Sequence, residues 1–237
     1  MEICPLSALS GERGSALLEP YRVGVYYAPS EDDPLWQVGS AWLGRDAQNN
    51  LATAQPPLPH LLENTAEPRR YGFHGTLKAP FALRFGFETF LHAATELAAR
   101  HKSFTLPSLA VTNLHGFLAL CPAEPAPQLH HLADECVSML DEHRVLEPAA
   151  KQAQRAAGKT TRQAEHIARW GYPFVFDDFN FHMTLTSQML NNPYFDAARV
   201  YFSAALAKTR QIKELSIFVE ETKGAPFKLF RRLPFLA

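Results

Sequence analysis

The amino-acid sequence predicts an α+β protein with mostly antiparallel sheets, and three features indicate this class. Short aromatic and β-branched runs, typical of strands, alternate with segments whose apolar residues recur at helical spacing. Two pairs of strands are joined by short turns, at His115-Gly116 and Lys223-Gly224, as in antiparallel hairpins. The frame Phe-His-x-Thr-Leu occurs at residues 73–77 and again at 181–185, which hints at two related halves.

The predicted strands are short runs that are rich in aromatic or β-branched residues. The first of them ends at Pro29, which is followed by an acidic segment suited to a turn and a helix start. In chain order, the strands are expected at residues 21–28, 73–78, 109–114, 117–120, 179–186, 214–220 and 227–230.

Helices are predicted between these strands. The segment at residues 87–102 has acidic residues early and basic residues late, as the helix dipole favours. Residues 45–70, rich in Ala, Asn and Pro, show no clean strand periodicity. The helices are expected at residues 35–43, 58–64, 87–102, 128–140, 149–169 with an interruption near Gly158, and 193–207 behind an opening proline.

Composition limits the classes of protein to consider. With 237 residues, of which 46% are hydrophobic, the chain can bury a sizeable core. The 23 basic and 24 acidic residues nearly cancel, which favours a small phosphorylated partner over a nucleic-acid duplex. The chain has no apolar run of membrane-spanning length and no signal-peptide pattern at its start, so a cytoplasmic location without a membrane partner is expected. Three widely spaced cysteines are interpreted as buried hydrophobes: Cys4, Cys121 and Cys136.

The repeated frame places its histidine and threonine on one face of each strand, because side chains along a strand alternate with a period of two. The opposite face of each strand is apolar. If the two halves pack as a pair, two imidazoles and at least two hydroxyls face a single ligand. The polar faces are expected to carry His74, Thr76 and Lys78 in the first copy, and Asn180, His182, Thr184 and Thr186 in the second.

This set of side chains suits phosphodiester hydrolysis. One histidine takes a proton from the attacking water and the other protonates the leaving oxygen, and a histidine pKa of about 6.5 permits either role. The hydroxyls of Thr76 and Thr184 are expected to hold the phosphoryl oxygens. The residues around this pair are the candidates for substrate binding: Arg22, Tyr26, Arg70, Tyr71, Lys78 and Thr186.

Two other chemistries were weighed against this one. A catalytic zinc needs a third protein ligand, and neither copy of the frame has His-x-His or His-Glu-x-x-His spacing, so no metal and no cofactor is predicted. The string Gly158-Lys159-Thr160 imitates the end of a nucleotide-binding P-loop. Ala153 stands where the leading glycine of that loop should be and no β-branched strand precedes it, so this interpretation is rejected.

The paired His-x-Thr motifs resemble those of the 2H phosphoesterase superfamily, and the resemblance covers most of the chain. Residues 70–81 (RYGFHGTLKAPF) and 115–120 (HGFLAL) resemble a branch associated with bacterial phosphonate utilisation.

This resemblance implies a single bilobal domain over residues 1–237, with two pseudo-symmetric, mostly antiparallel sheets and helices on the outside. It also implies metal-independent hydrolysis of a small cyclic phosphodiester, such as a ribose or nucleotide cyclic phosphate. The chain is longer than a minimal member, chiefly through insertions at residues 45–70 and 149–169, which are expected to cover the cleft and change its substrate.

Two alternative functions stay open at this point. The same chemistry on an RNA end, as a 2′,3′-cyclic phosphodiesterase, would need a basic and aromatic path leading from the cleft. A non-catalytic sensor of a phosphate ligand would keep the cleft for binding alone, although binding would not require two titratable groups.

Overall fold

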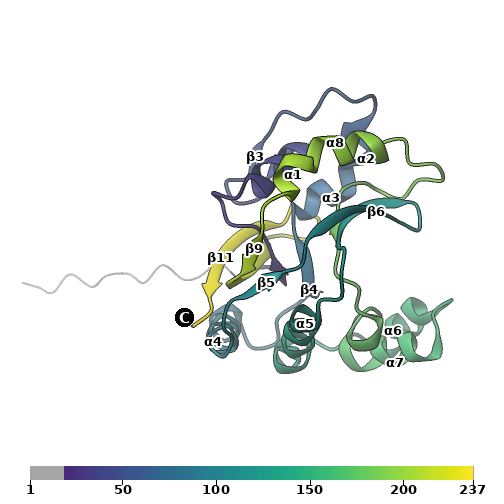
Figure 1. Cartoon of the computed structure of the whole chain (residues 1–237). Helices are drawn as coiled ribbons and strands as arrows, with labels where there is room; N and C mark the ends of the chain where they lie inside the picture. Colours follow the sequence, from purple (N-terminus) through teal and green to yellow (C-terminus); the bar gives the residue numbers. More distant parts are fainter. Residues whose placement is uncertain (1–18, 237) are drawn as a thin grey trace, which may run out of the picture.

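A seven-stranded antiparallel sheet forms the centre of the molecule, and Figure 1 shows it between two groups of helices. The computed structural model describes residues 19–236. Cys4, which was predicted to be buried, and the rest of residues 1–18 lie outside the described residues. The order across the sheet is β11-β10-β1-β4-β8-β7-β6. The strands are β1 Arg22–Tyr27, β4 Gly75–Phe81, β6 Leu109–Leu114, β7 Phe117–Pro122, β8 Met183–Thr184, β10 Glu214–Glu220 and β11 Lys228–Pro234.

Two further sheets of two strands each lie beside the main sheet. Their strands have only two or three residues, which is too short for the alternation of polar and apolar residues that predicts a strand. For this reason the amino-acid sequence alone does not predict them. They pair β2 Arg45–Asp46 with β3 Leu51–Ala52, and β5 Phe104–Leu106 with β9 Arg210–Ile212.

The helices form two groups in Figure 1, with α4 to α7 along the bottom of the view and α1, α2, α3 and α8 at the top. Among the described residues, every helix is too short or too polar to cross a membrane. Short 3₁₀ helices cover Asp141–His143 and Phe176–Asp178. The α-helices are α1 Pro34–Leu43, α2 Leu61–Asn64, α3 Ala66–Tyr71, α4 Phe87–Ala98, α5 Pro127–Met139, α6 Ala149–Ala156, α7 Thr161–Trp170 and α8 Phe195–Leu206.

Local sequence explains where these helices begin and end. The carboxylate of Asp33 accepts a hydrogen bond from the Leu35 amide, and α1 then ends at Gly44 in the left-handed conformation. The predicted break near Gly158 separates α6 from α7, with Gly158 at φ +74°. Helix α3 was not predicted, because Pro68 favours a loop; the proline lies in the first turn, where its missing amide costs no hydrogen bond.

The sequence prediction of an α+β fold with antiparallel strands is confirmed. The structure differs from the expected pair of sheets, because the two halves join in one continuous sheet at β4 and β8. The joint is a single residue pair, Gly75 opposite Met183. Glycine is required at this point, because a Cβ on Gly75 would lie 2.3 Å from Cζ of the Phe181 ring.

Strand β8 is much shorter than the predicted strand at residues 179–186. The segment before it contains the 3₁₀ helix Phe176–Asp178. After it, the amides of Leu185 and Thr186 both donate to the carbonyl oxygen of Leu118, so the regular ladder ends. The apolar side chains still point into the core as expected, and Phe181, Met183 and Leu185 are buried. The indole of Trp42 in α1 donates to the Leu185 carbonyl at 3.0 Å and fixes this segment to the helices.

The contact between Gly75 and Phe181 can be tested by overpacking it. We expect Gly75→Ala to lower the free energy of unfolding by about 1–3 kcal/mol, because the new methyl group overlaps the ring. Phe181→Leu removes the overlapping ring atoms, so the double variant should be more stable than the sum of the two single changes predicts. Urea denaturation measures all three, and strictly additive effects would contradict direct packing of these residues.

Candidate active site

A cavity of about 390 Å³ lies where β4 and β8 meet, and both copies of the repeated frame open into it. Side chains more than a hundred residues apart in the sequence therefore converge on one space. Seven of the ten candidate site residues line it: His74, Thr76, His182, Thr184, Tyr26, Tyr71 and Thr186.

Each of the two imidazoles makes a hydrogen bond of the same kind, to the backbone carbonyl oxygen two residues before it. Nδ1 of His74 lies 2.9 Å from the carbonyl oxygen of Gly72, and Nδ1 of His182 lies 2.7 Å from that of Asn180. Because a carbonyl oxygen only accepts, each Nδ1 must carry the proton. Nε2 of each neutral ring is therefore the unprotonated nitrogen. The two copies of the frame therefore hold their histidines in the same tautomer, with Nδ1 bound to the backbone in the same way.

Aromatic rings fix the position of each histidine. Tyr26 stacks on His74 with ring centroids 3.8 Å apart and an interplanar angle of 26°. Phe117 lies against His182 with centroids 5.6 Å apart. The hydroxyl of Thr76 is 3.2 Å from Nε2 of His74, so the threonine and its histidine contact each other directly.

Burial changes the proton affinity of both imidazoles. It lowers the pKa of His74 to about 4, with a smaller lowering from the charge of His182, against a raising by the Gly72 hydrogen bond. Burial also lowers the pKa of His182, partly opposed by its hydrogen bond to Asn180. At neutral pH His74 is therefore an unprotonated base.

The insertion at residues 45–70 supports the first histidine. Arg45 is buried and its guanidinium donates to the carbonyl oxygens of Arg69, Arg70 and Phe227. These bonds fix the end of α3, from which the chain reaches His74 in a few residues. The same segment places Glu67 and Pro68 on the wall of the cavity, and Tyr71, which also lines it, follows directly after the segment. That this segment covers the cleft stays a prediction.

Lys78 does not lie beside His74 and Thr76, where the period of two placed it. The register between β1 and β4 shifts between the pairs Val25–Lys78 and Tyr26–Thr76, so β4 contains a bulge there. A bulge inserts an extra residue and turns the following side chains to the other face. Lys78 is buried instead, with Nζ 3.0 Å from the Val137 carbonyl oxygen and 3.2 Å from the Asp141 carboxylate.

Arg22 and Arg70 also lie outside the cavity of the histidines. Both guanidiniums pair with the buried carboxylate of Glu220. Burial raises the pKa of Glu220, but its hydrogen bonds with Arg22 and Gly224 and the charges of both arginines hold that pKa below its ordinary value. Arg22 lines a neighbouring hollow, whereas Arg70 reaches back to the Gly224 carbonyl.

Thr186 lines the cavity, but its hydroxyl oxygen is already engaged. It accepts hydrogen bonds from the Leu118 amide at 3.0 Å and from the Asn192 side chain at 2.8 Å. Thr186 therefore joins β7 to the segment after β8. With both lone pairs of its hydroxyl oxygen engaged, it can interact with a ligand only as a hydrogen-bond donor.

Several cavity residues were not identified from the sequence. Phe117 follows the predicted turn at His115-Gly116, and Tyr172 follows the insertion at residues 149–169. Neither lies in a recognisable motif, and only the packing of distant segments brings them to the histidines. Within residues 19–236, no three His, Cys, Asp or Glu side chains come together as a potential metal site.

Comparison with protein families matches residues 76–228 to the model described as "Protein of unknown function (DUF1045)". Two curated relatives are named "Ribose 1,5-bisphosphate phosphokinase PhnN". The protein of Janthinobacterium sp. (strain Marseille) is 39% identical over 230 residues, and that of Laribacter hongkongensis (strain HLHK9) is 40% identical over 217. These alignments cover 90% and 89% of this chain but 51% of each relative, so the chain spans about half their length.

Among solved structures, E. coli LigT in complex with 3′-AMP is similar to this chain with a TM-score of 0.42 and 15% identity. The alignment covers 92% of this chain and 99% of LigT. The overall likeness is distant at these values.

The lowered pKa of His74 makes a prediction for stability. Between its ordinary value of 6.5 and about 4, the unfolded chain binds a proton at this residue that the folded chain does not. Stability should therefore fall as pH drops through this window, by roughly 2 kcal/mol at pH 5 from His74 alone.

We expect His74→Ala to reduce this acid destabilisation in urea denaturation at pH 7.5 and pH 5. His92→Ala is the control, because that side chain is 75% exposed on α4, and it should keep the wild-type fall. An unchanged pH dependence in His74→Ala would contradict the burial of a neutral imidazole.

Proposed function

The chain belongs to the DUF1045 family, and from the paired histidines of its cavity we propose that it hydrolyses a small cyclic phosphodiester as a metal-independent phosphoesterase of the 2H type. The observation that carries this proposal is the matched pair of Nδ1–H···O=C bonds, which leave one unprotonated Nε2 on each side of the joint between β4 and β8. Two such groups, each with a threonine two residues away, meet the needs of acid and base catalysis on one phosphorus atom.

The pKa values support a division of roles. His74, with a pKa of about 4, is unprotonated and takes a proton from the attacking water through Nε2. His182, when protonated, gives a proton to the leaving sugar oxygen. A bond from phosphorus to the water oxygen forms and the bond to the sugar oxygen breaks, giving a phosphomonoester and a free hydroxyl. The attacking water replaces the Thr76 hydroxyl at Nε2 of His74. The hydroxyls of Thr76 and Thr184 then donate to the non-bridging oxygens as charge develops there.

A ribose cyclic phosphate is the substrate class we propose, with a place in phosphonate breakdown. The names of the two curated relatives refer to a phosphorylated ribose, and the motif resemblance points to the phosphonate branch. The kinase activity in that name has less support in this chain. Gly158, Lys159 and Thr160 connect helix α6 to helix α7, whereas a P-loop connects a strand to a helix.

The two alternatives are an RNA-end phosphodiesterase and a ligand sensor. An RNA end would bind with an affinity that falls steeply with salt, because each phosphate contact releases counterions. Comparing turnover of a ribose cyclic phosphate, a 2′,3′-cyclic nucleotide and an oligonucleotide with a cyclic-phosphate end distinguishes the three. Turnover of the oligonucleotide alone would favour the first alternative, and binding without turnover of any would favour the second.

Removing either histidine should abolish most of the activity. We expect His74→Ala and His182→Ala each to lower kcat by about 10²- to 10⁴-fold, the usual contribution of a positioned acid or base. Phosphorus NMR measures this as the rate at which the phosphomonoester is released, with a chelator present. His92→Ala is the matched control on an exposed helix face and should retain wild-type turnover. Undiminished turnover in either active-site variant would exclude the two-histidine mechanism.

The pH dependence of kcat/KM should follow the free enzyme's two imidazoles. Activity should rise as His74 loses its proton around pH 4, and fall as His182 loses its proton, at a pKa below the ordinary 6.5. The bell should therefore peak on the acidic side of neutrality. A profile that continues to rise up to pH 8 would show that no group with the lowered pKa of His182 acts as the acid.

A further inference from the structure

A second hollow of about 190 Å³ lies directly beside the cavity of the histidines. The two spaces share four lining residues and are therefore direct neighbours: Tyr71, Ala79, Pro80 and Tyr172. The second hollow is far larger than the roughly 10–15 Å³ that holds one water molecule. A ligand in the first cavity thus has room for an attached group in the second.

The second hollow is lined by positive charge. Among the described residues that line it, four are cationic and none is acidic. This concentration contrasts with the near-neutral chain as a whole, whose net charge is −1. The four cations come from three separated parts of the chain: Arg22, Lys78, Arg144 and Arg155.

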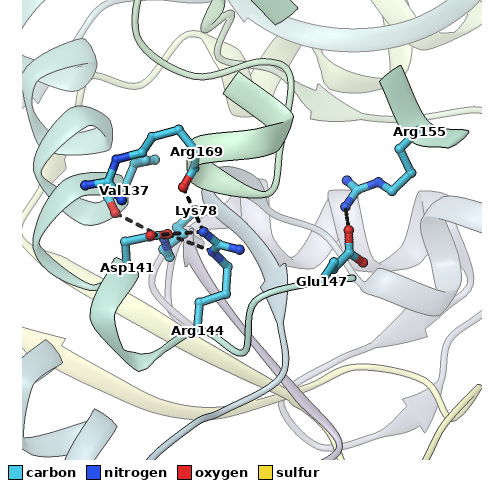
Figure 2. Close-up of polar contacts among 7 residues, drawn as sticks. All are labelled: Lys78, Val137, Asp141, Arg144, Glu147, Arg155 and Arg169. Atoms are coloured by element: carbon cyan, nitrogen blue, oxygen red, sulfur yellow. Dashed lines mark hydrogen bonds and ion pairs between the residues drawn. The ribbon is translucent and has the colours of Figure 1, made fainter. Parts of the chain in front are cut away.

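Carboxylates near the hollow neutralise only part of this charge. Asp141 lies between Lys78 and Arg144, and Figure 2 shows this group beside the pair of Glu147 with Arg155. Glu147 is also bound by Lys151. Each of these two carboxylates therefore forms ion pairs with two cations. Each set of one carboxylate and two cations keeps one net positive charge.

The third carboxylate, Glu220, follows the same pattern with Arg22 and Arg70. All three groups around the hollow are thus one negative charge short of balance. Of these cations, Lys78 and Arg144 are almost fully buried. A buried cation without full compensation is costly, and a bound anion removes part of that cost.

The cations are fixed in place before any ligand arrives. Arg144 donates twice to Asp141 and once to the Arg169 carbonyl oxygen, as Figure 2 shows. Gly171 leaves space for it, since a Cβ there would lie 3.0 Å from the Arg144 guanidinium. Lys78 is only 4% exposed, and burial lowers its pKa to about 8, partly opposed by Asp141. Preorganised charge of this kind favours binding because little side-chain entropy is lost.

Hydroxyl groups border the same space. Tyr71 and Tyr172 lie on the wall shared by the two hollows. Tyr26 lines the neighbouring cavity of the histidines, and its hydroxyl is buried without a hydrogen-bond partner among residues 19–236. A buried donor left unpaired is uncommon, and a ligand oxygen would satisfy it.

We propose that the second hollow binds a phosphomonoester group carried by the substrate itself, so that the ligand is a sugar with a cyclic phosphate and a separate phosphate. The inference rests on the proposed function for the cyclic group. A phosphomonoester suits this hollow because it carries nearly two negative charges and three acceptor oxygens, which arginine side chains bind well. The phosphodiesters of an RNA strand carry one charge each and match the three unbalanced groups less well.

The test compares two substrates that differ only in the second phosphate: ribose 1,2-cyclic phosphate and its 5-phosphorylated form. We expect the second phosphate to raise kcat/KM of the wild-type enzyme by about tenfold or more, as for a charge-assisted pair. Arg155→Ala should remove most of this advantage. Arg199→Ala is the matched control, because it removes the same charge from an exposed position on α8 and does not line the hollow. Equal kcat/KM for the two substrates would overturn the proposal.

A binding measurement separates failure of this inference from failure of the proposed function. If neither substrate is hydrolysed, calorimetric titration with ribose 5-phosphate still tests the hollow. Weaker binding by Arg155→Ala than by Arg199→Ala would support a phosphomonoester site, and equal binding by both variants would overturn it. Inorganic phosphate that binds as tightly as ribose 5-phosphate, with no advantage of the phosphorylated substrate, would assign the hollow to free phosphate and also overturn it.

Discussion

The structure depends on one contact, the pairing of β4 with β8 at Gly75 and Met183. This joint makes one sheet of the two related halves and brings His74 and His182 to the same cavity. It requires a residue without a side chain, because the Phe181 ring occupies the space that a Cβ at Gly75 would need. Gly75 and Met183, the unlike residues at the third position of the two frames, therefore pair across the joint, while the histidines and threonines of both frames line the cavity.

The sequence predicted the strand-based part of the site well, and the reason is geometric. A period of two places His and Thr of each frame together, and all four of these side chains line one cavity. The same rule failed for Lys78, because the bulge between Val25 and Tyr26 pairs shifts the register. A bulge depends on the partner strand, which the local sequence does not reveal. Likewise, Tyr172 reaches the site only through the packing of α6 and α7.

The cavity of the histidines and the neighbouring hollow share a wall but differ in their electrostatic environment. On one side, burial lowers the pKa of both imidazoles and keeps them neutral and reactive. On the other side, three carboxylates are each shared by two cations, so fixed positive charge remains. Arg45, in the segment of residues 45–70, binds the carbonyl oxygens of Arg69 and Arg70. Arg155, in the segment of residues 149–169, lines the hollow. Positive charge is thereby held close to the histidines without lying in contact with them.

The central claim is that Nε2 of His74 and Nε2 of His182 face one phosphoryl group. Nitrogen-15 NMR of the two imidazoles, assigned with the single-alanine variants, tests it most directly. The account predicts that both rings are neutral at pH 7 with the proton on Nδ1, and that both Nε2 resonances shift when a non-hydrolysable phosphorothioate analogue of the cyclic diester binds. A ring with its proton on Nε2, or a ligand that shifts only one of the two resonances, would contradict it.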